Sequence, residues 1–186
     1  MAPRVLVFAL LFVGTAARAD DLPVQLQVNL LSKMSTYVQN FVPAGTETVK
    51  VLVVHPGPKD GPTRGAQSLG STITQVGKLG KYGAEPKLVA YGDAKTFRAT
   101  LAAERPQVLY LAPELDSTLT AEIVEAATSS TVLTISGVAE HVRLGVVLGF
   151  ALMEGRPRVL INLKQAQKQQ IVFLSGLVSH SVVVDK

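Results

Sequence analysis

Short apolar runs alternate with amphipathic stretches along most of the chain, and this alternation constrains the fold more than any other feature. Nearly all-apolar runs stand at residues 49–54, 86–91, 107–112 and 131–136, and the first of them reads VKVLVV. Strands that are apolar throughout are buried on both sides, so they require helices over both faces of a mostly parallel sheet. The sequence therefore predicts an α/β fold, a single compact sandwich without a linker or internal repeat.

The stretches between these runs predict helices, because their apolar residues recur at three- and four-residue spacing. One helix is expected over 26–41, ended by Pro43 and Gly45, and a second over 65–83. The buried side of this second helix is expected to carry Leu69, Ile73, Val76 and Leu79. Two later helices are predicted to begin at N-cap residues, Asp93 for one and the 116–118 region for the other.

The pattern changes after Ser136. Residues 137–145 have room for one or two helical turns, and 146–163 predict two strands around a tight turn at Glu154 to Pro157, a β-hairpin-like addition to the sheet. A short helix is expected in the polar stretch 164–170. The tail from Ile171 onward fits a strand or a helix equally well, and both alternatives stay open.

The chain begins with MAPRVLVFALLFVGTAARA, which has the layout of a secretory signal peptide: a basic residue, an apolar run and a small-x-small ending. We expect residues 1–19 to be the signal, with cleavage after Ala19 and residues 20–186 forming the exported domain. A membrane anchor is the alternative, but the apolar run from Val5 to Val13 is far shorter than the roughly 20 residues that span a bilayer. A periplasmic protein without membrane insertion after cleavage is therefore predicted.

Charge and composition exclude several function classes. The chain has 18 basic and 14 acidic residues, and cleavage of the signal would remove two of the basic ones, Arg4 and Arg18. No cluster of basic residues is interleaved with aromatic ones, so a nucleic-acid partner is not expected. The absence of cysteine from the sequence excludes disulfides and thiol nucleophiles.

A glycine-rich stretch after the first strand, with glycines at 57, 61, 65 and 70, has the position of a phosphate-binding loop. It lacks both the G-x-G-x-x-G spacing of dinucleotide sites and the G-K-[ST] ending of a P-loop. We therefore interpret it as a strand-to-helix connection at the rim of the sheet. Its polar residues His55, Lys59 and Arg64 are predicted to tune contact with a partner.

Catalytic and metal-binding patterns are not found in the sequence. The histidines at 55, 141 and 180 each stand without a second ligand at metal-binding spacing. Serines at 136, 175 and 179 lie outside any G-x-S-x-G motif, and Glu122 and Glu125 are most simply explained by the solvated face of a helix. We predict no catalytic residue, cofactor or metal, and hence no enzyme.

The C-terminal half carries an ordered block of short motifs. The block consists of the strand VLTIS, a short segment before a G-x-x-x-x-F strand, a glycine turn, an INL-x-x-A motif and a closing S-x-L segment. It resembles the YfiR family of periplasmic proteins. The opening helix is also similar, with Tyr37, Val38 and Phe41 before Pro43, although Val42 replaces the aromatic residue often found there. The positions that carry the resemblance are Gly145, Phe150, Asn162, Ala166, Ser175 and Leu177.

This resemblance implies an α/β protein that contacts the periplasmic part of an inner-membrane signalling protein. The best-understood members restrain a membrane-bound diguanylate cyclase, which lowers cyclic-di-GMP production and affects biofilm formation, and they are often dimeric. The redox control seen in characterised members is ruled out here by the absence of cysteine. The six motif positions are expected to be structural or to contact the partner, with a structural role favoured because glycine and asparagine suit turns and strand ends.

A different class of function is also compatible with the sequence. One α/β lobe resembles half of a solute receptor, and the carboxyl ends of its parallel strands form a natural crevice. A single-lobe small-molecule binding protein is therefore the alternative prediction.

Overall fold

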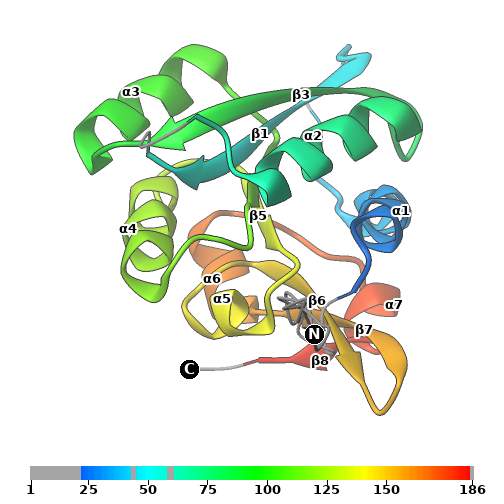
Figure 1. Ribbon diagram of the computed structural model, residues 1–186. Coiled ribbons are helices and arrows are strands. Elements are labelled where there is room, and N and C mark those ends of the chain that lie inside the picture. The colour runs from blue at the N-terminus through cyan, green and yellow to red at the C-terminus, as the bar shows by residue number, and fades with distance from the viewer. Residues whose placement is uncertain (1–21, 43–44, 58–60, 185–186) are drawn as a thin grey trace, which may run out of the picture.

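The computed structural model describes residues 22–42, 45–57 and 61–184. The predicted signal peptide and the predicted rim residue Lys59 lie outside these ranges. The described part forms one eight-stranded sheet with helices packed around it (Figure 1). The helices are α1 (Val24–Met34), η1 (Ser35–Tyr37), α2 (Arg64–Val76), α3 (Ala94–Glu104), α4 (Ser117–Ala127), α5 (Ala139–Arg143), α6 (Leu163–Lys168) and α7 (Ser175–Val178). The strands are β1 (Thr48–Pro56), β2 (Lys78–Leu79), β3 (Tyr82–Tyr91), β4 (Val108–Leu111), β5 (Leu133–Ser136), β6 (Leu148–Met153), β7 (Arg156–Ile161) and β8 (Val182–Val183).

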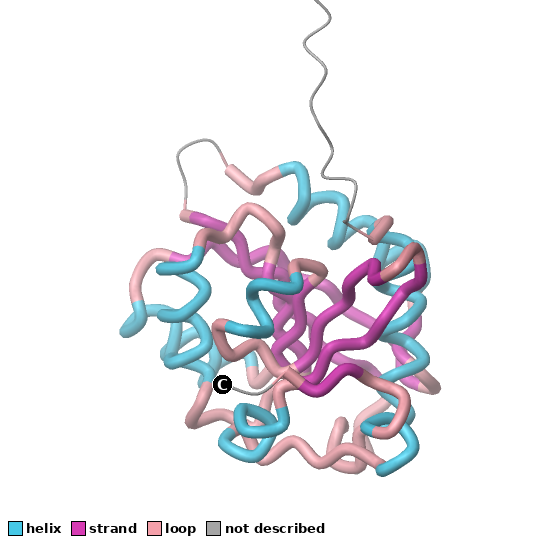
Figure 2. The backbone as a smooth tube through the Cα atoms, turned by 90° about the horizontal axis from the view of Figure 1, so that it is seen from below, coloured by secondary structure: helices cyan, strands magenta, loops and turns pink. Residues whose placement is uncertain are grey.

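The strand order is β2-β3-β1-β4-β5-β6-β7-β8. Neighbours from β3 to β6 are parallel, β2 and β7 run antiparallel to β3 and β6, and β8 is parallel to β7. The predicted α/β class and the C-terminal hairpin are both confirmed. Figure 2 shows the strands gathered in the interior with helices around them.

Alternation along β1 explains why helices are needed on both faces. Val51 and Val53 point into a core cluster that includes residues of α1 and α2. Leu52 and Val54 point into a second cluster with residues of α3 and α4. Because each face of this strand meets a different pair of helices, β1 is buried along most of its length.

Two predicted N-caps are confirmed. Asp93 Oδ1 accepts a hydrogen bond from the N–H of Thr96 at 2.9 Å, and Asp116 Oδ1 accepts one from the N–H of Leu119 at 2.8 Å. Each bond satisfies an N–H that has no partner inside the helix. The polar residues at these positions therefore decide where α3 and α4 begin.

The predicted helix over 65–83 is wrong in its second half. α2 ends at Val76 because Gly77 adopts a left-handed conformation with φ 67°. The chain then turns back through Gly80, also left-handed at φ 63°, and forms the antiparallel pair β2–β3. Leu79, expected on the buried side of the helix, is buried instead in β2.

The predicted helix over 26–41 is also too long, since α1 gives way to the 3₁₀ turn η1 at Ser35. The tail contains both of the structures that the sequence left open: a single helical turn, α7, followed by the short strand β8. The β6–β7 turn has positive φ at Glu154 (51°) and Gly155 (71°), as a tight hairpin requires. None of the helices in the described ranges is long and apolar enough to cross a membrane.

Candidate functional site

The carboxyl edge of the sheet is where parallel α/β folds bind ligands, and the glycine-rich connection lies there. Helix α2 begins just after Thr63, whose hydroxyl accepts a hydrogen bond from the N–H of Ala66. Glu114, in the loop after β4, places its carboxylate against this helix start. Its Oε1 accepts from the N–H of Gly65 at 2.7 Å, and its Oε2 accepts from the Thr63 hydroxyl at 3.0 Å.

The Glu114 carboxylate therefore occupies the position that an anionic ligand would take at a helix N-terminus. Gly65 makes this close approach possible, because a Cβ at residue 65 would lie 2.5 Å from Glu114 Oε1. The glycine thus serves an internal contact, which agrees with the interpretation of this segment as a connection.

The predicted rim residues separate in the structure. Arg64 is exposed at the start of α2. His55 is only 3% exposed, and its Nδ1 lies 2.8 Å from the carbonyl oxygen of Pro56. Of the two rim residues that the structure describes, Arg64 is the one whose side chain is exposed to solvent.

A serine and a histidine meet below the carboxyl edge, at the end of β5 and in α5. Ser136 Oγ lies 2.8 Å from His141 Nδ1, and His141 Nε2 lies 3.0 Å from the carbonyl oxygen of Leu115. Because a carbonyl only accepts, Nε2 carries the hydrogen and the Ser136 hydroxyl donates to Nδ1. Ser136 Oγ also accepts from the N–H of Val138 at 3.1 Å.

This pair is not arranged as a nucleophile and base. Ser136 has no exposed surface and His141 is 4% exposed, so a substrate has no access to the hydroxyl. The group that orients the ring is a backbone carbonyl rather than a carboxylate. Burial lowers the pKa of His141, and the Leu115 carbonyl and Glu140 offset this effect only in part. The lowered pKa favours the neutral ring in this network.

The six positions that carried the family resemblance lie in the C-terminal part of the fold. Asn162 caps α6 by accepting from the N–H of Gln165, and its side-chain amide donates to the carbonyl of Val142 at 3.2 Å. Gly145 has φ 112°, and a Cβ there would lie 2.9 Å from Val124 Cγ1. Phe150, Ala166 and Leu177 are buried, while Ser175 is exposed at the start of α7.

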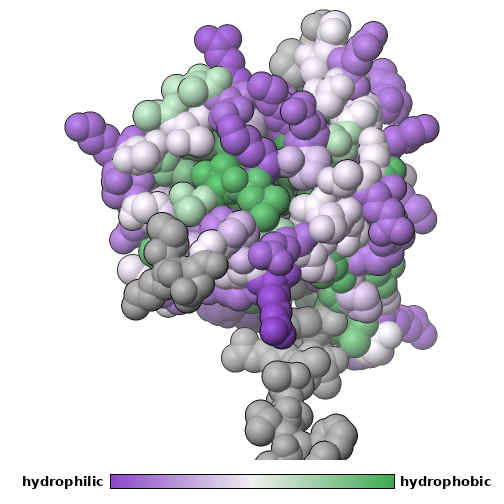
Figure 3. Space-filling view, turned by 45° about the horizontal axis from the view of Figure 1, so that its top comes forward, coloured by the Kyte–Doolittle hydropathy of each residue, from purple (hydrophilic) through white to green (hydrophobic). Residues whose placement is uncertain are grey.

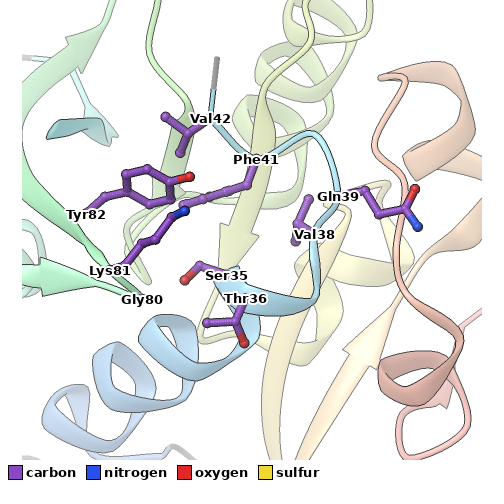
Figure 4. Close-up of a pocket in the computed structure, with 9 residues that line it drawn as sticks. All are labelled: Ser35, Thr36, Val38, Gln39, Phe41, Val42, Gly80, Lys81 and Tyr82. Atoms are coloured by element: carbon purple, nitrogen blue, oxygen red, sulfur yellow. The ribbon is translucent and has the colours of Figure 1, made fainter. Parts of the chain in front are cut away.

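A cavity of about 330 Å³ opens between η1 and the β2–β3 turn (Figure 4). The rings of Phe41 and Tyr82 lie there at an interplanar angle of 53° with centroids 6.5 Å apart, and Lys81 Nζ lies 5.3 Å from the Tyr82 centroid. The hydroxyls of Ser35 and Thr36 already donate to backbone carbonyls of the preceding turn. These two hydroxyls therefore do not need a ligand to complete their hydrogen bonds.

A smaller cavity of about 130 Å³ lies between the start of α1 and the ends of β4 and β5. At its floor the buried Tyr110 hydroxyl donates to Gln27 Oε1 at 2.6 Å, and Gln27 Nε2 donates to the carbonyl of Leu22. Burial raises the pKa of Tyr110, so the hydroxyl keeps its proton. This pair fastens α1 to the centre of the sheet.

An exposed apolar patch is formed by Tyr37, Val172 and Leu174, which are 39%, 47% and 40% exposed. The chain after α1 and the chain before α7 pair in antiparallel fashion at the bridge between Val38 and Phe173. The N–H of Leu174 donates to the carbonyl of Tyr37, and the N–H of Gln39 donates to the carbonyl of Val172, both at 2.9 Å. Val38 is buried and Phe173 half-buried, so the three patch residues point outward.

Sequence reasoning missed three of these features. The hydrophobic pattern placed Tyr37 on the buried face of a helix, whereas it is exposed at the surface. The Glu114 cap and the Gln27–Tyr110 pair join segments far apart in the chain, and neither leaves a local pattern. Among the described residues, no group of histidine and acidic side chains is placed to hold a metal ion.

Comparison with protein families gives a match to the YfiR/HmsC-like family over residues 25–181. The chain belongs to this family. The match spans nearly all of the described fold and confirms the resemblance predicted from the C-terminal motifs. Membership supports a role as a periplasmic regulator of cyclic-di-GMP signalling. A comparison with curated proteins gives no match.

Solved structures with a similar fold have low sequence identity to this chain. One is a domain in complex with L-Trp from Streptococcus pneumoniae (TM-score 0.60, 12% identity, covering 87% of this chain and 60% of that one). Another is a conserved domain protein from Vibrio cholerae (TM-score 0.56, 14% identity, covering 89% of this chain and 61% of that one). A third is the ligand-free, open form of a substrate binding protein with adhesive properties from Clostridium difficile (TM-score 0.57, 10% identity, covering 89% of this chain and 61% of that one). At these identities the likeness concerns the fold, and this chain spans only about three-fifths of their length.

Proposed function

We propose that this protein restrains a membrane-bound diguanylate cyclase, or a related membrane sensor, by direct contact with the sensor's periplasmic part. The observation that carries the proposal is the exposed apolar patch of Tyr37, Val172 and Leu174. Large side chains of this kind on a protein surface are typical of protein-contact sites, where aromatic anchors contribute most of the binding energy. The family membership supplies the kind of partner.

The backbone pairing beneath the patch supports a docking role. Asn40 fastens the two segments further, since its amide donates to the carbonyl of Gln170 and its Oδ1 accepts from the N–H of Val172. The patch is thus held in place before a partner arrives, which lowers the entropy cost of binding. Arg64 and Lys59 are proposed as secondary contacts at the rim, and Ser175, next to Leu174, as a polar contact beside the patch.

The other parts of the proposal concern processing and chemistry. We infer that the protein is exported to the periplasm and that its signal peptide is cleaved after Ala19. N-terminal sequencing of the mature protein tests this inference, and Asp20 is expected as the first residue. We also infer that the protein is not an enzyme, an inference supported by the inaccessible Ser136–His141 pair.

A small-molecule receptor, the alternative, is not favoured by the geometry. The Glu114 carboxylate sits at the helix start where an anionic solute would bind. Ligand-induced thermal shifts with amino acids and organic anions are expected to be absent, and a saturable shift would restore this alternative.

The test compares cells with and without this gene. Deletion is expected to raise the cellular level of cyclic-di-GMP, and re-expression of the unchanged protein should lower it to the level of the parent strain. The variants Tyr37→Asp and Leu174→Asp should leave the level raised, because each substitution weakens binding to the sensor by roughly tenfold or more. Met153→Asp is the matched control, because Met153 is an equally exposed apolar residue (43%) on the β6–β7 hairpin, outside the patch.

Two outcomes would overturn the proposal. One is a deletion strain with unchanged cyclic-di-GMP. The other is full restoration by both patch variants, provided that circular dichroism shows them folded. Crosslinked complexes should contain a membrane protein with a cyclase domain, and their loss in the Tyr37→Asp strain would tie the contact to the patch.

A further inference from the structure

The apolar patch of Tyr37, Val172 and Leu174 is too small to form a stable interface by itself. A specific contact between two proteins buries roughly 800 Å² on each partner. Each of the three patch side chains is less than half exposed, so together they cannot supply that area. A partner that docks on the patch therefore covers neighbouring surface as well.

The cavity between η1 and the β2–β3 turn adjoins the patch. Thr36 and Val38, the chain neighbours of Tyr37, both line this cavity, and Lys81 lines it from the turn (Figure 4). Lys81 is exposed, and its Nζ lies 5.3 Å from the centroid of the Tyr82 ring, whose face attracts the ammonium group. The surface next to the patch on this side thus carries a positive charge that the ring holds in place.

The segments around the patch carry positive charge and no negative charge. Residues 22–42 and 169–184, which form the patch, contain no acidic residue, and their one lysine or arginine is Lys33. The turn between β2 and β3 adds Lys81 and likewise no acid. The whole chain has 18 basic and 14 acidic residues, so the lack of acids is a local property of this surface.

Lys33 also stands next to the patch. It lies four residues before Tyr37 on the continuous path of α1 and η1, and residues at that spacing share one face of a helix. Its side chain is exposed. The ion pairs of the described residues lie elsewhere, on Lys87 and Arg143, so neither Lys33 nor Lys81 is neutralised by an acidic neighbour.

We propose that the partner surface that docks on the patch is acidic at its rim, and that Lys33 and Lys81 attract it. The inference rests on the proposed function, because it names the chemistry of the surface that the patch binds. Carboxylates opposite the two lysines would favour the encounter, whereas positive charges there would oppose it. Charges of this kind act mainly on the association rate, and salt screens them.

The acidic groups are assigned to a protein rather than to lipid headgroups. Recognition of anionic lipid takes clusters of about four to eight lysines or arginines, more than the two that flank this patch. Large apolar side chains surrounded by a few charges are instead the usual arrangement of a protein–protein contact.

The test measures binding of the purified, exported protein to spheroplasts of the deletion strain, which present the periplasmic face of the inner membrane. Rates are compared at about 0.1 M and about 1 M salt, between which the Debye length falls from about 10 Å to about 3 Å. Lys33→Glu and Lys81→Glu should each slow association by roughly threefold or more at the lower salt concentration and have little effect at the higher one. Lys81→Gln, which removes one charge without reversing it, should give a smaller loss.

Lys95→Glu is the matched control. It makes the same change of net charge at an exposed lysine of α3, which packs on the opposite face of the sheet from α1. Figure 3 brings the α3 side of the molecule forward and shows hydrophilic side chains projecting around apolar surface there. The association rate of this variant should equal that of the unchanged protein.

The outcomes separate this inference from the proposed function. Lysine variants that associate as fast as Lys95→Glu, or a rate that does not change with salt, would overturn the inference. If Tyr37→Asp weakens binding in that case, docking on the patch stands and only the acidic rim is rejected. Absence of binding by the unchanged protein would reject both.

A lipid partner gives a different result. Binding that survives protease treatment of the spheroplasts, and that is equally strong on vesicles of their extracted lipid, would assign the negative charge to headgroups. That result would overturn the inference, because the rim of a protein surface is removed by the protease.

Discussion

Glu114 caps helix α2 from the loop that follows strand β4: its Oε1 accepts a hydrogen bond from the N–H of Gly65 at 2.7 Å. We expect Glu114→Ala to lower the free energy of unfolding by about 1–2 kcal/mol, because it removes both the cap and a negative charge next to the helix dipole. Urea denaturation measures the loss. Glu125→Ala, at an exposed acid on α4, should change stability by less than about 0.5 kcal/mol. Equal effects of the two substitutions would show that the cap contributes nothing.

The Gln27–Tyr110 pair gives a second prediction. Tyr110→Phe removes the hydroxyl that donates to Gln27 Oε1 and leaves that buried oxygen without its donor. The expected cost is about 1–3 kcal/mol. Gln27→Leu in the Tyr110→Phe background should recover part of this stability, because it removes the unpaired Gln27 Oε1. The recovery is only partial, since the Leu22 carbonyl then loses the hydrogen bond from Gln27 Nε2. Stability that falls further in the double variant would contradict this explanation.

The buried ring of His141 predicts a pH dependence. Its pKa in the folded protein is lowered, mainly by burial, from the ordinary value of 6.5. The unfolded chain therefore takes up a proton first as the pH falls. The contribution to stability is complete above about pH 6.5 and is lost as the pH falls from there toward the lower value of the folded state.

Denaturation at about pH 7.5 and about pH 5 tests this prediction. The loss of stability between the two conditions should be smaller for His141→Gln than for the unchanged protein, because glutamine does not titrate. An identical loss in both proteins would assign the pH dependence to other groups.

Two glycines with positive φ are predicted to differ in their tolerance of substitution. Gly145 (φ 112°) would bring a Cβ within 2.9 Å of Val124, whereas Gly155 (φ 71°) has no atom within 4 Å of that position. Gly145→Ala combines backbone strain with a clash and should cost more than about 2 kcal/mol. Gly155→Asn should cost less than about 1 kcal/mol, because asparagine tolerates the left-handed region. Thermal denaturation of both variants gives the comparison.

Much of the fold could be predicted from local patterns. The nearly all-apolar runs identified the central parallel strands because burial on both faces leaves few polar positions along them. Asp93 and Asp116 marked helix starts because a side-chain oxygen there satisfies a free N–H. The hairpin was visible because turn residues separate two apolar segments.

The errors and omissions have physical causes as well. Leu79 fits helical spacing, yet left-handed glycines on either side of it bend the chain into β2–β3. A hydrophobic pattern cannot show that outcome because either structure buries Leu79. The Glu114 cap and the surface around Tyr37 depend on contacts between distant segments, which are set by the completed packing rather than by neighbouring residues.

The bridge between Val38 and Phe173 has a consequence for the order of folding. It joins segments near the two ends of the described chain, so the central parallel sheet can assemble before it, while the Tyr37 and Leu174 surfaces meet only when the last segment docks. A chain clipped before Ile171 would lack Val172, Phe173 and Leu174 and could not form this surface, although all the parallel strands from β3 to β6 would still be present. The patch therefore exists only on a chain that has been made and folded through Leu174.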